Sequence, residues 1–377
     1  MKKIKIAFVL PPSALPIPAM KGGAIETLLT MLLYENEKMG KYEFVFIVPD
    51  EKEQINSWKH SKVYGLSEGG SGEKFPYDHK ANRIVKEEAV DYLIMEGGAR
   101  RMDGCFRETV RKDRLAIHLH HAFLRKGIYN DAFGVTIAPS RFIANSWNKE
   151  DPENQRRTYI LKNSIDVDKF NCKISVEERN EMRGSLGFSQ EDFVVIFCGR
   201  LIQGKGVKEL LQAVLLIPKP NLKLLLVGSD SFKNGNKGIY SREVVEIAEQ
   251  NKEKITYIGY VDNEKMSQMY QCADLQVIPS LLEEAFCLVA LEAMCSGLPL
   301  IYTNSGGMPE IVPHNAGIMV RKEDDIVGQL ADKIQWILEH PLERMQMSKA
   351  ACEHTQHYSQ KQYYLDFGKM IDWWGKL

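Results

Sequence analysis

Short apolar segments alternate along the whole chain with longer segments that have helical periodicity. The apolar segments are rich in Val, Ile, Leu and aromatic residues, a composition typical of strands buried in a parallel sheet. They predict one series of strands at residues 4–10, 43–48, 92–95, 115–119, 135–138 and 158–162, and a second at residues 194–198, 222–227, 255–257, 275–278, 300–302 and 317–320.

Segments with apolar residues at intervals of three and four lie between these strands and predict amphipathic helices. Examples lie at residues 26–37, 207–216, 241–249 and 263–271. Alternation of strands and helices predicts parallel sheets covered by helices on both faces. Two series of about six strands therefore predict an α/β protein with two doubly wound, Rossmann-like domains at residues 1–165 and 166–354.

The C-terminal segment carries a further helical pattern that ends in Trp373 and Trp374. Adjacent aromatic side chains are unfavourable in water, so this helix is expected to pack against another part of the chain. We expect the segment of about residues 355–377 to complete the first domain.

The composition is that of a globular protein with more than one core. Of the 377 residues, 44% are hydrophobic and 26% are charged, and the net charge of −1 gives no indication of nucleic-acid binding. Seven cysteines show no C-x-x-C pair, which favours a reducing cytoplasm over a disulfide framework or a structural zinc site. No apolar run approaches the ~20 residues of a membrane span, and four prolines interrupt the apolar start, which predicts a strand there instead of a signal peptide.

The charge is distributed unevenly. Residues 1–165 hold 26 basic and 21 acidic side chains, whereas the remainder holds 23 basic and 29 acidic ones. The basic excess is concentrated at residues 100–126. This stretch is either a solvated helix face or a surface attracted to a phosphorylated acceptor or to the inner face of the cell membrane.

Glu284 and Glu292 flank a run in which almost every residue from Phe286 to Met294 is apolar. Such a run predicts a helix that is buried on all sides. A carboxylate inside it must accept hydrogen bonds, because an unpartnered buried charge is costly. The paired hydroxyls of a ribose or the backbone amides of the core would both satisfy Glu292, and the sequence leaves both open.

A glycine-rich turn, Gly199 to Val207, joins a predicted strand to a predicted helix. Arg200 and Lys205 place two cations near a helix N-terminus, which itself attracts anions, so a diphosphate would fit there. A plain turn with solvated cations is the alternative. The turn lacks both the G-K-S/T order of a Walker loop and the G-x-G-x-x-G spacing.

His118, His120 and His121 lie at the end of another predicted strand. They have either a structural role or a contact with a sugar hydroxyl. No further ligands and no H-E-x-x-H pattern are evident, so we predict no metal site. Asp166-Val167-Asp168 has the spacing of metal-dependent sugar transferases, but its position between the domains predicts a capped turn.

Several short motifs accompany these segments. In chain order they are Gly22-Gly23, His120, Asn163-Ser164-Ile165-Asp166, Gly199-Arg200, Lys205-Gly206, Gly259, Glu284 with Glu292, Gly297-Leu298-Pro299 and Gly306-Gly307-Met308-Pro309-Glu310. Together they resemble the family-4 retaining glycosyltransferases, with their Glu-x7-Glu spacing. The resemblance covers essentially the whole chain and implies the GT-B fold, in which two Rossmann-like domains face a central cleft.

The resemblance also implies roles for particular residues. Glu292 is expected to bind the donor ribose and Glu284 the hydroxyls of the transferred sugar, which His120 would also contact. The diphosphate is expected to meet Arg200, Lys205, the glycines Gly22 and Gly23, and the amides around Phe286, Cys287, Leu288 and Val289. The base is expected near Tyr260 and Val261. Cys287 stands where the family usually has glycine, and it is expected to offer its amide if the backbone stays helical.

The implied activity is transfer of a sugar, with retention, from a nucleoside diphosphate donor to a glycan, a lipid-linked acceptor or a small molecule. A UDP-sugar is the expected donor, and guanosine and thymidine are the alternatives for the base. Arg200, Lys205, Glu284 and His120 are the expected catalytic residues, with no cofactor and no metal ion. The second domain would bind the donor and the first the acceptor. A nucleotide-sugar epimerase and a non-catalytic GT-B subunit are the alternatives.

Overall fold

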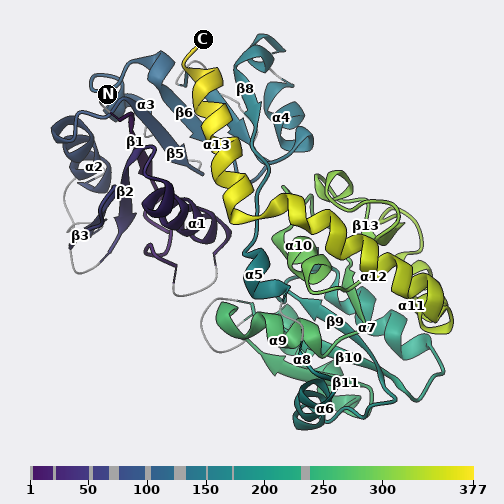
Figure 1. The fold of residues 1–377 in the computed structure, drawn as a ribbon. Helices are drawn as coiled ribbons and strands as arrows, with labels where there is room; N and C mark the ends of the chain where they lie inside the picture. The colour runs from purple at the N-terminus through teal and green to yellow at the C-terminus, as the bar shows by residue number, and fades with distance from the viewer. Residues whose placement is uncertain are drawn as a thin grey trace. The chain divides into compact units, whose positions relative to one another are not determined.

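The computed structural model describes residues 3–19, 23–50, 54–67, 76–97, 103–122, 133–149, 152–171, 174–230 and 238–377. The chain divides into two compact units, which Figure 1 shows as ribbons. Unit 1 comprises Met1–Ser164 together with Gln360–Leu377, and unit 2 comprises Ile165–Ser359.

Unit 1 contains a sheet with the strand order β3-β4-β2-β1-β5-β6-β7-β8. Neighbouring strands are parallel except for the antiparallel pair β3 and β4. The strands are β1 (Lys5–Val9), β2 (Glu43–Pro49), β3 (Ile55–Ser57), β4 (Ser61–Leu66), β5 (Tyr92–Glu96), β6 (Leu115–His118), β7 (Val135–Ala138) and β8 (Thr158–Ile160).

Helices from both ends of the chain cover this sheet. They are α1 (Ala24–Met39), α2 (Pro76–Glu87), α3 (Asp103–Phe106), α4 (Arg141–Asn148) and α13 (Gln360–Trp374), with short 3-10 turns at Lys112–Arg114 and Pro152–Arg157. The C-terminal helix α13, yellow in Figure 1, lies beside α1, and the Tyr364 hydroxyl donates to Oδ1 of Asn36 at 2.8 Å. The Trp374 indole donates to the Asp113 carbonyl at 2.7 Å. The aromatic end of the chain is therefore anchored in unit 1.

Unit 2 contains a sheet with the strand order β11-β10-β9-β12-β13-β14, and all neighbours are parallel. The strands are β9 (Phe193–Cys198), β10 (Leu222–Val227), β11 (Ile255–Gly259), β12 (Leu275–Ile278), β13 (Leu300–Thr303) and β14 (Gly317–Val320). The helices are α5 (Val167–Phe170), α6 (Val176–Ser185), α7 (Val207–Leu216), α8 (Ile239–Gln250), α9 (Met266–Gln271), α10 (Leu288–Cys295), α11 (Ile326–Glu339) and α12 (Pro341–Thr355). Short 3-10 turns lie at Gln203–Lys205, Asn263–Lys265, Met308–Glu310 and Gln356–Tyr358.

The predicted α/β class with two parallel-sheet domains is confirmed, because every predicted strand is present. Continuous apolar runs such as Phe193–Cys198 are buried along their whole length, as expected where helices cover both faces of a sheet. Strands β3 and β4 were not predicted from the sequence. β3 is fully exposed. In β4, exposed or half-buried side chains alternate with buried ones, and the strand contains Gly65, so neither strand forms an apolar run. Asp166 caps α5 by accepting the Lys169 amide, which confirms the predicted capped turn.

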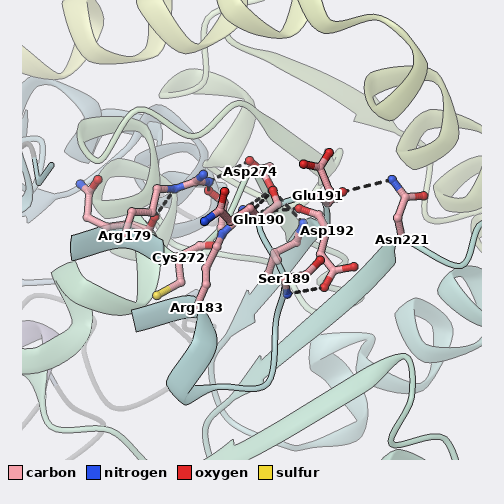
Figure 2. Close-up of polar contacts among 12 residues, drawn as sticks. Arg179, Arg183, Ser189, Gln190, Glu191, Asp192, Asn221, Cys272 and Asp274 are labelled. Carbon is pink, nitrogen blue, oxygen red and sulfur yellow. Dashed lines mark hydrogen bonds and ion pairs between the residues drawn. The ribbon is translucent and has the colours of Figure 1, made fainter. Parts of the chain in front are cut away.

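A charged network closes the amino-terminal edge of the sheet in unit 2, and Figure 2 shows Arg179 and Arg183 reaching Asp274 from α6. Arg183 is 1% exposed, and its Nη2 lies 2.6 Å from Oδ2 of Asp274. The same Oδ2 accepts the amide of Val194, at the start of β9, at 2.8 Å. One carboxylate thus ties α6 to two neighbouring strands.

Among the described residues, no helix has the length and apolar character needed to cross a membrane.

Candidate functional site

Three loops that follow neighbouring strands converge at the carboxyl edge of the sheet in unit 2. The loop after β9 accepts hydrogen bonds at the Gly204 carbonyl from the amides of Leu281 and Leu282, in the loop after β12. That second loop in turn accepts the Gly307 amide at the Glu284 carbonyl, at 2.7 Å, from the loop after β13. The carboxyl edge of a parallel sheet is where open α/β domains bind ligands.

Two glycines allow this close approach. Gly206 has a φ of +66°, and a Cβ there would lie 1.9 Å from the Pro279 carbonyl oxygen. Gly306 has a φ of +53°, and its Cβ would lie 2.2 Å from the Glu284 carbonyl oxygen. Both loops therefore depend on glycine for their conformation and for their packing.

Lys205 and Glu284 form an ion pair at this edge. Lys205 Nζ lies 2.6 Å from Oε1 of Glu284, and the same oxygen accepts the Ser280 hydroxyl at 2.6 Å. The Lys205 side chain is 23% exposed and that of Glu284 is 13% exposed, so both remain accessible from one side. Arg200 is exposed and forms no ion pair with the part of the chain that the structure describes.

Helix α10 begins at this edge with an unusual backbone. Its N-cap, Cys287, has φ +84° and ψ +80°, a left-handed conformation that non-glycine residues rarely adopt. The condition of a helical backbone, on which the expected role of the Cys287 amide depended, is therefore not met. The turn instead starts the helix abruptly, so the amides of Leu288 and Val289 lie in its first turn, where N–H groups have no intrahelical acceptor. Phe286 is buried in the core below the turn.

Glu292 lies within α10, and the Tyr270 hydroxyl donates to its Oε2 at 2.9 Å. The sequence left a ribose or backbone amides as donors, and it gave no signal for a tyrosine on α9. Burial raises the pKa of Glu292, although the Tyr270 hydrogen bond and the charge of Lys169 oppose the shift.

The pKa of the Cys287 thiol is influenced by these charges. Burial is the largest of the causes that raise its pKa to about 12, the carboxylate of Glu284 also raises it, and the ammonium of Lys205 opposes the rise. Glu292 also contributes to the shift. The structure therefore brings Lys205, Glu284, Cys287 and Glu292 together around the start of α10.

The predicted base contacts follow β11. Tyr260 and Val261 are half-buried, and Val261 packs against the core of unit 2. The Tyr260 hydroxyl is buried and finds no hydrogen-bond partner among the described residues. A ligand atom would satisfy this hydroxyl.

His120 lies in unit 1, and a residue that the sequence analysis did not consider binds it. Oε2 of Glu96 lies 2.8 Å from Nε2 of His120 and 2.9 Å from Nδ1 of His118. Burial lowers the pKa of His120 to about 4. Burial alone would raise the pKa of Glu96, but the charge of His118 and the two imidazole hydrogen bonds outweigh it and lower the value to about 2.

The remaining predicted positions lie partly outside the described residues. Gly22 is outside them, whereas Gly23 lies directly before α1, beside the carboxylate of Glu26, whose Oε1 accepts the Leu15 amide at 2.7 Å. Of the basic stretch at residues 100–126, the structure describes residues 103–122. Within the described part, Arg111 pairs with Asp113 at 2.8 Å.

A separate hollow in unit 2 has a volume of about 570 Å³ and is lined by residues of α6, α10 and α12. Its lining includes neither Lys205 nor the two motif glutamates. Arg179 and Asp274 line it and bind each other at 2.8 Å.

Part of unit 2 matches a known family model. Residues 178–354, which make up most of unit 2 and just under half of the chain, match the model of the family described as glycosyl transferases group 1.

Three curated proteins are similar to this chain. An uncharacterised glycosyltransferase of Methanocaldococcus jannaschii is 30% identical over 46% of this chain and 44% of its own length. The lipopolysaccharide 1,2-N-acetylglucosaminetransferase of Salmonella typhimurium is 28% identical over 59% of this chain and 57% of its own length. The matches thus span about half of these two relatives. Spore coat protein SA of Bacillus subtilis is 24% identical over 92% of this chain and 93% of its own length.

The fold is shared with solved structures. The crystal structure of HepE from Anabaena in complex with UDP matches 98% of this chain and 100% of that chain, with a TM-score of 0.77 and 19% identity. This likeness establishes the fold, and the predicted GT-B class is confirmed.

Proposed function

We propose that this chain, whose residues 178–354 belong to the group 1 glycosyl transferases, transfers a sugar from a nucleoside diphosphate donor that binds at the carboxyl edge of unit 2. The Lys205–Glu284 ion pair beside the start of α10 is the observation that carries the proposal. It places a cation, a carboxylate and free helix amides within reach of one ligand. A diphosphate would bind the cation and the helix amides, and a sugar hydroxyl would donate to the carboxylate.

The ion pair explains how binding and chemistry are linked. A diphosphate would draw Lys205 away from Glu284, and the released carboxylate would then accept hydroxyls of the sugar. As the bond between the anomeric carbon and the β-phosphate oxygen breaks, charge develops on the phosphate, and Lys205, Arg200 and the α10 amides stabilise it. The acceptor oxygen forms the new bond, and its proton passes to the departing phosphate on the same face, which gives retention.

No divalent metal ion is needed in this scheme, because protein cations and helix amides offset the phosphate charge. The accessible cations Lys205 and Arg200 support this view. Tyr270 holds one oxygen of Glu292 and leaves the other for a ribose hydroxyl, and the unpartnered Tyr260 hydroxyl suits a polar edge of the base. UDP is the proposed nucleotide, since the structurally similar HepE was crystallised with it.

For the acceptor we propose a glycan or a lipid-linked saccharide, the class named for the Salmonella relative. Such an acceptor would be met at the cytoplasmic face of the membrane. The contact of the basic stretch at residues 100–126 with that surface, and the contact of His120 with the donor sugar, remain predictions.

The test is a Lys205→Ala variant assayed against a panel of nucleotide sugars, with lipid-linked and free glycan acceptors. We expect the rate of transfer to fall by about 10²–10³-fold, as when one oxyanion donor is removed. Lys208→Ala is the matched control, because Lys208 lies three residues away and pairs with the exposed Glu243 at the surface. Product NMR should show the donor's anomeric configuration, and Mg²⁺ or Mn²⁺ should not raise the rate.

Three outcomes would contradict the proposal. Transfer by Lys205→Ala at the wild-type rate would remove Lys205 from the site. Conversion of the donor sugar without any acceptor would indicate an epimerase. Failure to bind UDP, GDP or TDP in calorimetry would indicate a non-catalytic subunit.

A further inference from the structure

Three buried side chains with metal-ligating atoms meet at the carboxyl edge of the sheet in unit 1. Glu96 ends β5 and is the register partner of His118 at the end of β6. His120 lies two residues further along the same extended segment, so it points to the same face as His118. Glu96, His118 and His120 are 2%, 3% and 9% exposed.

The ligating atoms of these residues already converge on one point. Oε2 of Glu96 lies within 2.9 Å of Nδ1 of His118 and 2.8 Å of Nε2 of His120, and the two imidazole centroids are 4.2 Å apart. Ligands of a tetrahedral zinc ion, at about 2.0–2.1 Å from it, are roughly 3.3 Å from one another. Oε2 of Glu96 would need to move only about half an ångström away from each nitrogen to reach this spacing, and all three ligating atoms lie within 4.8 Å of one another.

Hydrogen bonds within the cluster do not satisfy it. Both imidazoles lie within hydrogen-bond distance of Oε2 of Glu96. Oε1 of Glu96 and Nε2 of His118 are buried without a hydrogen-bond partner among the described residues. The buried hydroxyl of Tyr363, from α13, is also unpartnered. A buried polar atom without a partner is unfavourable, so a buried carboxylate with one free oxygen points to a further cationic partner.

We propose that Glu96, His118 and His120 bind one divalent transition-metal ion of the zinc type in unit 1. Two imidazole nitrogens and one carboxylate favour zinc, cobalt or a similar ion over Mg²⁺ and Ca²⁺, which take oxygen ligands. Each imidazole keeps its proton on the nitrogen that does not bind the ion. The carboxylate offsets half of the ionic charge and can engage its second oxygen. The bound ion would tie β5 to the segment that follows β6.

Sequence alone gave no third ligand for these histidines, because Glu96 lies 22 positions before His118. Only the parallel pairing of β5 with β6 brings the three together. The proposal goes beyond the transfer reaction and concerns residues of unit 1 only.

The test is a Co²⁺ titration of the full chain, purified without a histidine tag. We expect visible d–d absorption bands that saturate at one ion per chain and disappear when zinc is added. Thiolate ligation would add a near-ultraviolet charge-transfer band, so its absence excludes the cysteines as ligands. In Glu96→Gln and His118→Asn, we expect Co²⁺ to bind at least about 100-fold more weakly, more than is usual for loss of an outer partner.

His121→Gln is the matched control, because His121 is the adjacent histidine but is exposed. It should keep wild-type Co²⁺ binding, and zinc should raise the thermal midpoint of the control and of the wild type but not that of Glu96→Gln. A wild-type chain that gives no saturable cobalt spectrum would overturn the proposal and leave a hydrogen-bonded triad, and so would a spectrum unchanged in Glu96→Gln. The wild-type titration is decisive even if a variant fails to fold. None of these readouts depends on sugar transfer.

Discussion

In both units, an aspartate directly before one strand accepts a backbone amide of the neighbouring strand at the amino-terminal edge of the sheet. In unit 1, Asp91 directly precedes β5, and its Oδ2 accepts the amide of Lys5, at the start of β1, at 2.9 Å. In unit 2, Asp274 directly precedes β12 and accepts the amide of Val194, in β9, at 2.8 Å. Strands β1 and β9 hold corresponding places in the two strand orders, so the shared topology is accompanied by a shared carboxylate.

The carboxyl-terminal edges differ. In unit 2 this edge carries Lys205 and Glu284, which pair with each other but remain partly exposed. In unit 1 the same edge carries Glu96 and two histidines, and their side chains are at most 6% exposed. The same edge of the sheet therefore carries an accessible charged pair in unit 2 and a buried polar cluster in unit 1. Accessible charges are expected to affect ligand binding, whereas buried charges are expected to affect stability.

The largest expected effect lies at the shared amino-terminal edge. Asp274→Asn would leave the guanidinium of Arg183, which is 1% exposed, without its carboxylate. We expect the free energy of unfolding to fall by about 3 kcal/mol, because removing one partner of a buried ion pair is costly. Asp91→Asn, the matched change in unit 1, should cost about 1 kcal/mol, since it weakens the hydrogen bond from one amide. Urea denaturation followed by circular dichroism measures both losses in the free energy of unfolding. Equal losses in the two variants would show that the ion pairs with the arginines do not contribute to stability.

Most of the fold could be predicted because both sheets are built from apolar runs. Burial on both faces makes a central strand such as Phe193–Cys198 visible without any partner. The strand β4, next to the edge strand β3, was missed because Lys62 and Tyr64 alternate with buried residues around Gly65. A strand that buries one face only carries a weaker signal in its sequence than a fully buried one.

Site residues were predictable where each belongs to a short local motif. Glu284 and Glu292 were found because one loop and one helix carry both. Tyr270 and Glu96 were missed, because each meets its partner through strand and helix packing over 22 positions or more. The left-handed backbone of Cys287 was also missed, since a cysteine gives no signal for a positive φ.

A second prediction concerns ligand recognition in unit 2. In the wild type, UDP should bind about 10-fold more tightly than 2′,3′-dideoxy-UDP, because a carboxylate that accepts a ribose hydroxyl contributes about 1.5 kcal/mol or more. Glu292→Gln should abolish most of this difference while changing stability little. Since burial raises the pKa of Glu292 above its usual value of 4.5, the preference should weaken as the pH falls through the raised value. Calorimetry with both nucleotides measures the effect.

The matched control is Glu249→Gln, because Glu249 is exposed on α8 in the same unit. It should preserve the discrimination between the two nucleotides. If Glu292→Gln discriminated as well as the wild type, Glu292 would be a core carboxylate satisfied by Tyr270 alone. The contrast between accessible and buried charges would then not extend to α10.

The smallest expected effect tests the backbone at the start of α10. At most positions alanine is more stable than glycine by about 0.5–1 kcal/mol, but a left-handed conformation costs a side chain with a Cβ about 1–2 kcal/mol. Because Cys287 has a φ of +84°, we expect Cys287→Gly to be about 1 kcal/mol more stable than Cys287→Ala. At Cys352, a half-buried cysteine within α12, the same two substitutions should show the ordinary order. Thermal unfolding of the four variants provides the comparison. Should alanine be favoured at both positions, the backbone at residue 287 would not be left-handed, and the abrupt helix start that frees the Leu288 and Val289 amides for an anion would be lost with it.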